Sequence, residues 1–180
     1  MPRLILLNGA PAVGKSTLAR RYAADRPLTL VLDLDHVRRM LGRWRDDPGA
    51  AGVRARSLAV AAAREHLAAG YDVVVPQLVG RVEFIERLAA TAAESGAEFA
   101  EVYLRDDADR LVRRFAERAE VAADPVHVEA AETHAGGEDG LRAYHARMEA
   151  LVSERPQAVA VESVPGDVEA TYRGLLAALG

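Results

Sequence analysis

The chain has 180 residues and a mass of 19.3 kDa, and half of its residues are hydrophobic, so it can build one sizeable core and is too short for two ordinary domains. It contains no cysteine, which excludes disulfides and thiolate metal sites. The formal net charge of -4 disfavours nonspecific binding to polyanions but leaves room for a local basic patch.

The N-terminus leads directly into an apolar run at residues 4–7, which predicts a strand buried on both faces. No basic start or long apolar stretch precedes this run, and no segment approaches membrane-spanning length. We therefore expect a soluble, cytoplasmic protein without membrane contact. Hydrophobic residues recur at helical spacing between Ser16 and Asp25, so the predicted order is strand, loop, helix.

The loop between this strand and helix has the pattern G-x-x-x-x-G-K-[ST] and carries the only lysine of the chain, Lys15. A loop that surrounds triphosphate oxygens needs the compact ammonium of lysine rather than a planar guanidinium. Gly9 and Gly14 let the backbone N–H groups point at phosphate oxygens. Lys15 would reach the β- and γ-phosphates of ATP, and the Ser16 hydroxyl would ligate Mg²⁺. The predicted nucleotide-binding residues are Gly9, Ala10, Pro11, Ala12, Val13, Gly14, Lys15, Ser16 and Thr17.

Two carboxylates, Asp33 and Asp35, follow a second apolar run at residues 28–32. We predict a helix that starts near His36, with Asp35 as its cap. Ligands of a parallel sheet bind beyond the carboxyl ends of the strands, so both carboxylates would lie beside the γ-phosphate. One would hold Mg²⁺ or its waters, with Asp33 as the metal candidate, and the other would accept the proton of an acceptor hydroxyl. Which of the two is the base stays open, and the alternative is a cap and a solvated loop residue without catalytic roles.

Arginines are densest between residues 38 and 56. Arg38 lies three residues after Asp35 and would bind an anionic group of the acceptor, whereas a solvated helical face explains the rest of the cluster. After a turn at residues 46–49, an alanine-rich helix at 51–69 is expected to end at Gly70. A third strand at 72–76 ends in Gln77 rather than in an aspartate, so Asp33 or water must support the metal. Gln77 is a candidate contact of the acceptor.

The remaining pattern predicts helices at 82–95, 107–120, 141–155 and 168–179, and strands at 99–104 and 158–161. Five apolar runs separated by helices predict an α/β protein, with a five-stranded parallel sheet between two helical layers. Together with the phosphate loop, this is a three-layer α/β/α P-loop NTPase fold. We expect a single domain over residues 1–180, with a small lid at about 119–140, where the apolar periodicity fades.

Arg110, Arg114 and Arg118 recur every four residues on the helix that precedes this lid. Arg114 and Arg118 are predicted catalytic residues, because a lid can bring positive charge to the transferring phosphoryl group and exclude water. The alternative is a solvent face on which the arginines pair with neighbouring carboxylates. His127 and His134 lie within the lid and have no metal-ligating company, so we assign them no role.

These motifs resemble those of small phosphate-loop kinases, which are AAA-type proteins that phosphorylate hydroxyl groups of small molecules. Residues 32–38 are similar to the Asp-Gly-Asp-Asn-Val-Arg stretch of adenylylsulfate kinases, with Leu34 in place of the glycine. Residues 102–118 are similar to the lid entry of gluconate kinases, and the placement of Asp33 resembles that of the base in chloramphenicol phosphotransferase. The resemblance implies transfer of the γ-phosphate of ATP, with Mg²⁺, to a sugar, nucleoside, sulfonucleotide or antibiotic hydroxyl.

Two other functions remain open. A polynucleotide or tRNA end kinase would use the arginine cluster on phosphates, but the net acidity and the few aromatic residues make nucleic acid an unlikely partner. A nucleotide-binding switch would hydrolyse ATP without an acceptor. The oligomeric state stays open.

Overall fold

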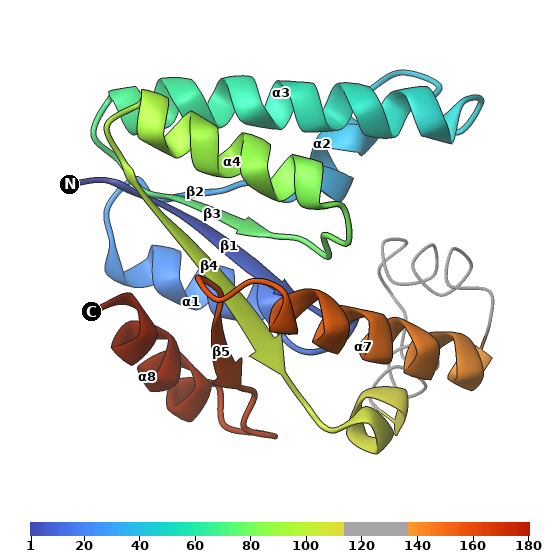
Figure 1. The fold of residues 1–180 in the computed structure, drawn as a ribbon. Helices are drawn as coiled ribbons and strands as arrows, with labels where there is room; N and C mark the ends of the chain where they lie inside the picture. The colour runs from blue at the N-terminus through green and yellow to red at the C-terminus, as the bar shows by residue number, and fades with distance from the viewer. Residues whose placement is uncertain (114–136) are drawn as a thin grey trace.

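The computed structural model describes residues 1–113 and 137–180, and at its centre lies a five-stranded parallel sheet in the order β2-β3-β1-β4-β5 (Figure 1). The phosphate loop follows the central strand, which pairs with β3 on one side and β4 on the other. The strands are β1 (Arg3–Gly9), β2 (Leu30–Val31), β3 (Val73–Pro76), β4 (Glu98–Arg105) and β5 (Val159–Glu162).

Helices cover both faces of the sheet (Figure 1). One face carries α1 (Lys15–Asp25) and α8 (Val168–Leu179), and the other carries α3 (Pro48–Ala68) and α4 (Val82–Glu94). A short α2 (Leu34–Arg39) precedes α3, and α7 (Gly137–Ser153) precedes β5. The predicted three-layer α/β/α arrangement is confirmed. None of the helices within the described ranges is both long and apolar enough to cross a bilayer.

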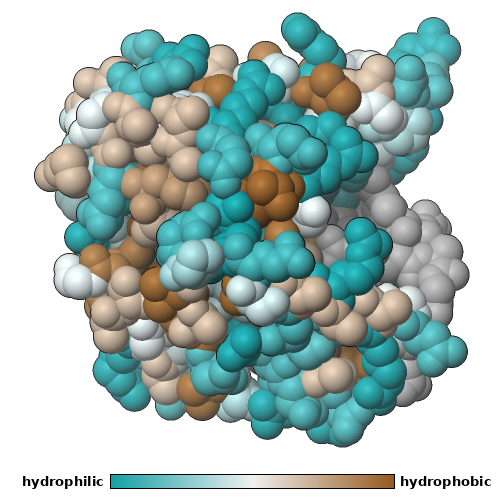
Figure 2. All heavy atoms as spheres, viewed as in Figure 1, coloured by the Kyte–Doolittle hydropathy of each residue, from teal (hydrophilic) through white to brown (hydrophobic). Residues whose placement is uncertain are grey.

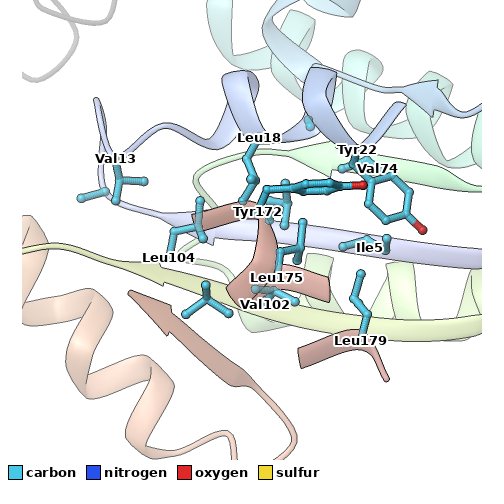
Figure 3. Packing of buried hydrophobic residues seen from close by; sticks show 14 of the residues in the cluster. Ile5, Val13, Leu18, Tyr22, Val74, Val102, Leu104, Tyr172, Leu175 and Leu179 are labelled. Carbon is cyan, nitrogen blue, oxygen red and sulfur yellow. The ribbon is translucent and has the colours of Figure 1, made fainter. Parts of the chain in front are cut away.

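The central strand explains why the sequence showed continuous apolar runs rather than alternation. Leu4 and Leu6 pack in the cluster on the α3–α4 face, whereas Ile5 and Leu7 pack in the cluster on the α1–α8 face. Figure 3 shows the second cluster, in which Tyr22 and Leu175 are grouped with Ile5. Because both faces are covered, both sets of side chains must be apolar.

Several boundaries differ from the sequence-based expectation. β2 is shorter than residues 28–32, because Leu28 adopts a left-handed φ of 59° and leaves 65% of its surface exposed. α3 begins at Pro48 because the Asp47 side chain accepts a hydrogen bond from the Ala50 backbone N–H. α7 begins at Gly137, so the last four residues of the predicted lid are helical.

The helix that follows the predicted lid is anchored by charge pairs. Two residues after the helix ends at Ser153, the buried Arg155 donates from Nε to Glu101 Oε1 at 2.8 Å and pairs through Nη1 with Glu86 Oε1 at 2.8 Å. Hydrogen bonding to Glu101 raises the pKa of Arg155 above its ordinary value. Arg105 Nη2 contacts Glu149 Oε2 at 2.7 Å. These pairs tie α7 to β4, and the segment that follows α7 to β4 and α4.

Candidate active site

The loop between β1 and α1 is shaped as a cradle for an anion. Gly9 and Gly14 have φ values of 140° and 105°, which side chains rarely tolerate. Gly14 is the N-cap of α1, where it provides no side-chain acceptor, and the first turn of α1 has no acidic residue. The first N–H groups of a helix have no partner within it, so their positive end is left to a ligand. Ser163 supports the loop from the far side, because its Oγ donates to the Val13 carbonyl at 3.0 Å.

Lys15 is folded over the loop that precedes it. Its Nζ donates to the carbonyl oxygens of Gly9 at 2.9 Å and Ala10 at 2.8 Å. The flexible stem of lysine lets the ammonium turn from these carbonyls to a phosphate without moving the backbone. The loop therefore has both the fixed donors and the mobile cation that a triphosphate needs.

Replacing Gly9 with alanine is expected to destabilise the protein more than the same change at Gly14. A Cβ at Gly9 would lie 2.6 Å from the backbone oxygen of Leu104, whereas a Cβ at Gly14 would meet nothing within 4 Å. Both variants carry the strain of a positive φ, about 1–3 kcal/mol, and only Gly9→Ala must also displace β4. Urea unfolding should give the lower midpoint for Gly9→Ala, and equal midpoints would show that the contact with Leu104 is relieved at no cost.

Asn8 joins the start of the phosphate loop to the loop that follows β3. Its buried Oδ1 accepts hydrogen bonds from the backbone N–H of Gly9 at 2.9 Å and of Val79 at 3.0 Å. Its Nδ2 donates to the carbonyl of Val79 at 2.9 Å. One side chain thus satisfies both backbone groups of Val79 and fixes the loop at residues 77–81 beside the phosphate cradle.

Asp33, and not Asp35, caps the helix after β2. Asp33 Oδ1 accepts hydrogen bonds from the backbone N–H groups of Asp35 at 2.9 Å and His36 at 3.4 Å, and α2 begins at Leu34. The predicted cap at Asp35 is therefore wrong, because the chain turns into the helix two residues earlier and buries Leu34. The second oxygen of Asp33, Oδ2, lies 3.4 Å from His36 Nδ1.

Asp35 and Arg38 lie side by side on α2. Asp35 Oδ1 is 3.3 Å from Arg38 Nη2, and the Asp35 side chain is 41% exposed. The Arg38 guanidinium lies over the ring of Trp44, 4.7 Å from its centroid, and Arg45 lies 4.4 Å from the same ring. Stacking holds a planar guanidinium in one orientation. Arg38 is therefore a positioned positive charge next to a carboxylate that solvent can reach.

The strand register brings the ends of β2, β3 and β1 to one edge. Leu7 pairs with Pro76, and Val31 pairs with Val74, so the residues that follow each strand are neighbours in space. Gln77 is among them, and its Oε1 is buried with no hydrogen-bond partner in the part of the chain that the structure describes. Leaving a buried acceptor unsatisfied is costly, which points to a water or a ligand hydroxyl at this place.

The donor set fits magnesium held largely by phosphate. Within residues 1–113 and 137–180, no group of three or more histidine, aspartate or glutamate side chains could hold a metal ion. Mg²⁺ is commonly bound through one or two protein oxygens together with substrate phosphates and waters. Ser16, in the first turn of α1, and Asp33, with one carboxylate oxygen outside the cap, match this pattern.

Arg114, Arg118, His127 and His134 lie outside the described residues. Arg110 is described, and its Nε donates to Asp106 Oδ1 at 2.7 Å, where the Asp106 carboxylate is fully buried. This bond raises the pKa of Arg110 above its ordinary value. Arg110 therefore follows the alternative expectation, a local pair with a neighbouring carboxylate.

A comparison with models of protein families shows which family the chain belongs to. The model of a family described as AAA domain matches residues 4–137, which is most of the chain. The chain belongs to the AAA domain family. Among curated proteins, none matches the sequence.

Solved structures resemble this AAA domain protein over nearly its full length. A gluconokinase from Sinorhizobium meliloti 1021 is 19% identical with a TM-score of 0.61, over 99% of this chain and 91% of the other. A putative kinase from Chloroflexus aurantiacus j-10-fl is 21% identical with a TM-score of 0.63, over 99% and 96%. A chain of the Pnkp1/Rnl/Hen1 RNA repair complex is 18% identical with a TM-score of 0.65, over 87% of this chain but 47% of the other. The AAA domain protein thus has the fold of small P-loop kinases, as the sequence predicted.

Proposed function

We propose that the protein is an ATP-dependent phosphotransferase that moves the γ-phosphate to a hydroxyl group of a small molecule. The observation that carries the proposal is a phosphate cradle with a mobile lysine, placed at the same sheet edge as two carboxylates. In this proposal residues 1–180 form one kinase domain with a lid at about 119–140. Arg114 and Arg118 of the lid entry stabilise the transferring phosphoryl group.

Each residue of the candidate site has its own role in phosphoryl transfer. The loop amides and the Lys15 ammonium bind the phosphates, and Lys15 leaves the Gly9 and Ala10 carbonyls to do so. Mg²⁺, held by Ser16 and Asp33, would supply positive charge to the phosphate oxygens. The acceptor oxygen forms a bond to the γ-phosphorus, its proton passes to a carboxylate, and the bond from phosphorus to the bridging oxygen breaks to release ADP. Positioning and charge stabilisation account for most of the rate.

The cap geometry favours Asp35 over Asp33 as the base. Asp33 Oδ1 already accepts two backbone N–H groups, so only Oδ2, which lies 3.4 Å from His36 Nδ1, would be offered to Mg²⁺ or to one of its waters. Asp35 is more exposed than Asp33, with 41% of its side chain exposed against 18%. Arg38, next to Asp35 and stacked on Trp44, would orient the acceptor.

The similar solved structures suggest two kinds of phosphate acceptor, a small molecule and an RNA end. The likeness to the gluconokinase covers almost all of both chains and favours a small hydroxyl acceptor. The likeness to a chain of the RNA repair complex makes an RNA end the second candidate. A formal net charge of -4 and an aromatic content of 5% offer little for nonspecific RNA binding.

One panel of acceptors tests the function. ADP release is measured with ATP and Mg²⁺ in the presence of sugars, nucleosides, sulfonucleotides, aminoglycosides or short RNAs with a 5′-hydroxyl. We expect one small-molecule class to raise ADP release well above the rate without acceptor, and mass spectrometry to find its phosphate ester. Stimulation by RNA alone would indicate an end kinase, and turnover that no acceptor changes would indicate a nucleotide switch.

A further inference from the structure

The backbone pairing between β1 and β3 stops at a proline. The last pair of the ladder is Leu7 with Pro76, and proline has no N–H with which to continue it. The next N–H, that of Gln77, donates to the Val75 carbonyl at 3.0 Å, so it bonds back to its own strand rather than across to β1. Gln77 and Leu78 therefore leave the sheet as a short segment beside the phosphate loop, which we call the β3 excursion.

A side chain resumes the pairing after the β3 excursion, at Val79. Asn8 Oδ1 accepts a hydrogen bond from the Val79 N–H at 3.0 Å, and Asn8 Nδ2 donates to the Val79 carbonyl at 2.9 Å, as a neighbouring strand would. The same Oδ1 accepts from the Gly9 N–H at 2.9 Å. A carboxylate could not donate to the carbonyl, so this arrangement requires an amide. Asn8 therefore fixes the far end of the excursion to the first residue of the phosphate cradle.

The end of the β3 excursion is also anchored in the core. The Val79 side chain is 4% exposed and belongs to the cluster on the α3–α4 face. On the face shown in Figure 2, hydrophobic residues are interspersed with hydrophilic ones over these two helices, which contribute to that cluster. Pro76 is paired in the sheet at one end of the excursion, and Val79 is held by Asn8 and by the core at the other. Gln77 is thus held in place beside the phosphate cradle.

The strand order places Gln77 between two parts of the transfer site. β3 lies between β2 and β1 in the sheet. The pairing of β2 with β3 continues to Leu32, whose N–H donates to the Val74 carbonyl at 2.8 Å, and Asp33 is the next residue. The phosphate loop follows β1 on the other side. The β3 excursion therefore lies between the proposed metal ligand Asp33 and the proposed phosphate site.

The amide of Gln77 has the chemistry to bind a hydroxyl group. Its Oε1 is buried and has no hydrogen-bond partner among residues 1–113 and 137–180. Leaving a buried acceptor unsatisfied is costly, so a ligand with an O–H or N–H donor fits here. A neutral amide brings no charge to a metal, but it both accepts and donates hydrogen bonds, as a hydroxyl does. Gln77 therefore suits the phosphate acceptor better than it suits Mg²⁺.

We propose that Gln77 binds a second hydroxyl group of the phosphate acceptor, next to the hydroxyl that receives the phosphoryl group, and that Asn8 is the positioning residue that holds Gln77 there. The inference rests on the proposed function and adds the substrate class. The acceptor is a compound with neighbouring hydroxyl groups, such as a sugar or a nucleoside, rather than a simple alcohol. Binding the second hydroxyl orients the first for attack on the γ-phosphorus.

The scarcity of side-chain amides makes binding at Gln77 directly visible. The chain has one asparagine, Asn8, and two glutamines, Gln77 and the exposed Gln157. Their NH₂ signals are recorded by ¹H–¹⁵N NMR with Mg²⁺ and a non-hydrolysable ATP analogue bound, and are assigned with Gln77→Leu and Gln157→Leu. A hexose, a ribonucleoside or an aminoglycoside is then titrated. We expect one of these classes to shift the Gln77 signals and to leave those of Gln157 in place.

Matched acceptors test whether Gln77 recognises a hydroxyl group. Each of the three acceptors is compared with its monodeoxy forms. In the unaltered protein, loss of one hydroxyl other than the phosphorylated one should lower kcat/KM at least about tenfold. Gln77→Leu should remove this preference by raising KM for the complete acceptor. KM for ATP and the Mg²⁺ concentration for half-maximal turnover should stay unchanged, and Gln157→Leu should keep the preference.

Asn8→Ala tests the positioning role. It keeps the Gln77 amide but removes the hydrogen bonds that hold the end of the β3 excursion. It should therefore lose the same preference among acceptors as Gln77→Leu, and the Gln77 NMR signals should no longer respond to the acceptor. Thermal unfolding checks that the variant is folded. A folded Asn8→Ala that keeps the preference contradicts the positioning role, and if the variant does not fold, Gln77→Leu alone decides.

The outcomes separate this proposal from phosphoryl transfer itself. An unchanged preference in Gln77→Leu, or transfer only to simple alcohols or to a 5′-hydroxyl oligonucleotide, overturns the role of Gln77 but keeps phosphoryl transfer. A higher Mg²⁺ requirement of Gln77→Leu with every acceptor also overturns it and assigns the amide to a metal-bound water. If an acceptor shifts the Gln77 signals but none is phosphorylated, the transfer function fails while the binding site stands. If neither is seen, both proposals fail.

Discussion

Lys15→Ala is expected to lower ATP turnover at least about a hundredfold, since it removes the one mobile cation of the phosphate cradle. In the structure the ammonium donates to the loop carbonyls of Gly9 at 2.9 Å and Ala10 at 2.8 Å. Those carbonyls can be solvated when the side chain is shortened, so the fold should survive. ADP release and thermal unfolding, measured on the same preparation, separate loss of chemistry from loss of structure.

Two control variants sharpen this test. Arg20→Ala removes an exposed positive charge from the same helix and should leave turnover unchanged. Lys15→Arg keeps the charge but replaces a compact ammonium with a planar guanidinium, so it should restore little activity. Full turnover in Lys15→Ala would refute the role of the cradle in catalysis.

The features that the sequence predicted well are those specified by neighbouring residues. The phosphate loop is encoded by Gly9, Gly14 and Lys15 within a few positions, and its backbone geometry follows from the glycines. The strands β1 and β3 were visible because they are buried along almost their whole length, and their side chains on both faces of the sheet must therefore be apolar. Such local signals give the elements and their order, and the order gives the fold class.

What the sequence could not predict are contacts made across the chain. The bonds from Asn8 to Val79 and from Ser163 to Val13 join residues 71 and 150 positions apart. No periodicity encodes such pairs, because the sequence around a polar residue at a strand end does not specify which distant residue it will bond to.

These long-range contacts hold the phosphate loop from two sides. Asn8 ties its first residue to the loop after β3, and Ser163 ties its middle to the loop after β5. Because β1 lies at the centre of the sheet, the cradle can be braced by loops from both directions. A braced loop keeps its donors in place before the nucleotide arrives, which is how a site stabilises charge without reorganising.

The pair Asp35→Asn and Asp33→Asn is expected to separate proton removal from metal support. Asp35→Asn should lower kcat by about 10²–10⁴, the usual contribution of a general base, and leave the Mg²⁺ requirement unchanged. Asp33→Asn keeps an oxygen that can accept from the N–H groups of Asp35 and His36, and asparagine caps helices as well as aspartate. Its main effect should therefore be a higher Mg²⁺ concentration for half-maximal turnover.

Asp33→Ala serves as the matched structural control, because it removes the cap as well as the charge. It should cost about 1 kcal/mol of unfolding free energy beyond Asp33→Asn, measured by urea denaturation. Initial rates measured across a Mg²⁺ titration then show which of the two carboxylates is the base and which supports the metal. If Asp33→Asn lowers kcat at saturating Mg²⁺ and Asp35→Asn does not, the roles are reversed, and the residue that caps α2 is also the base.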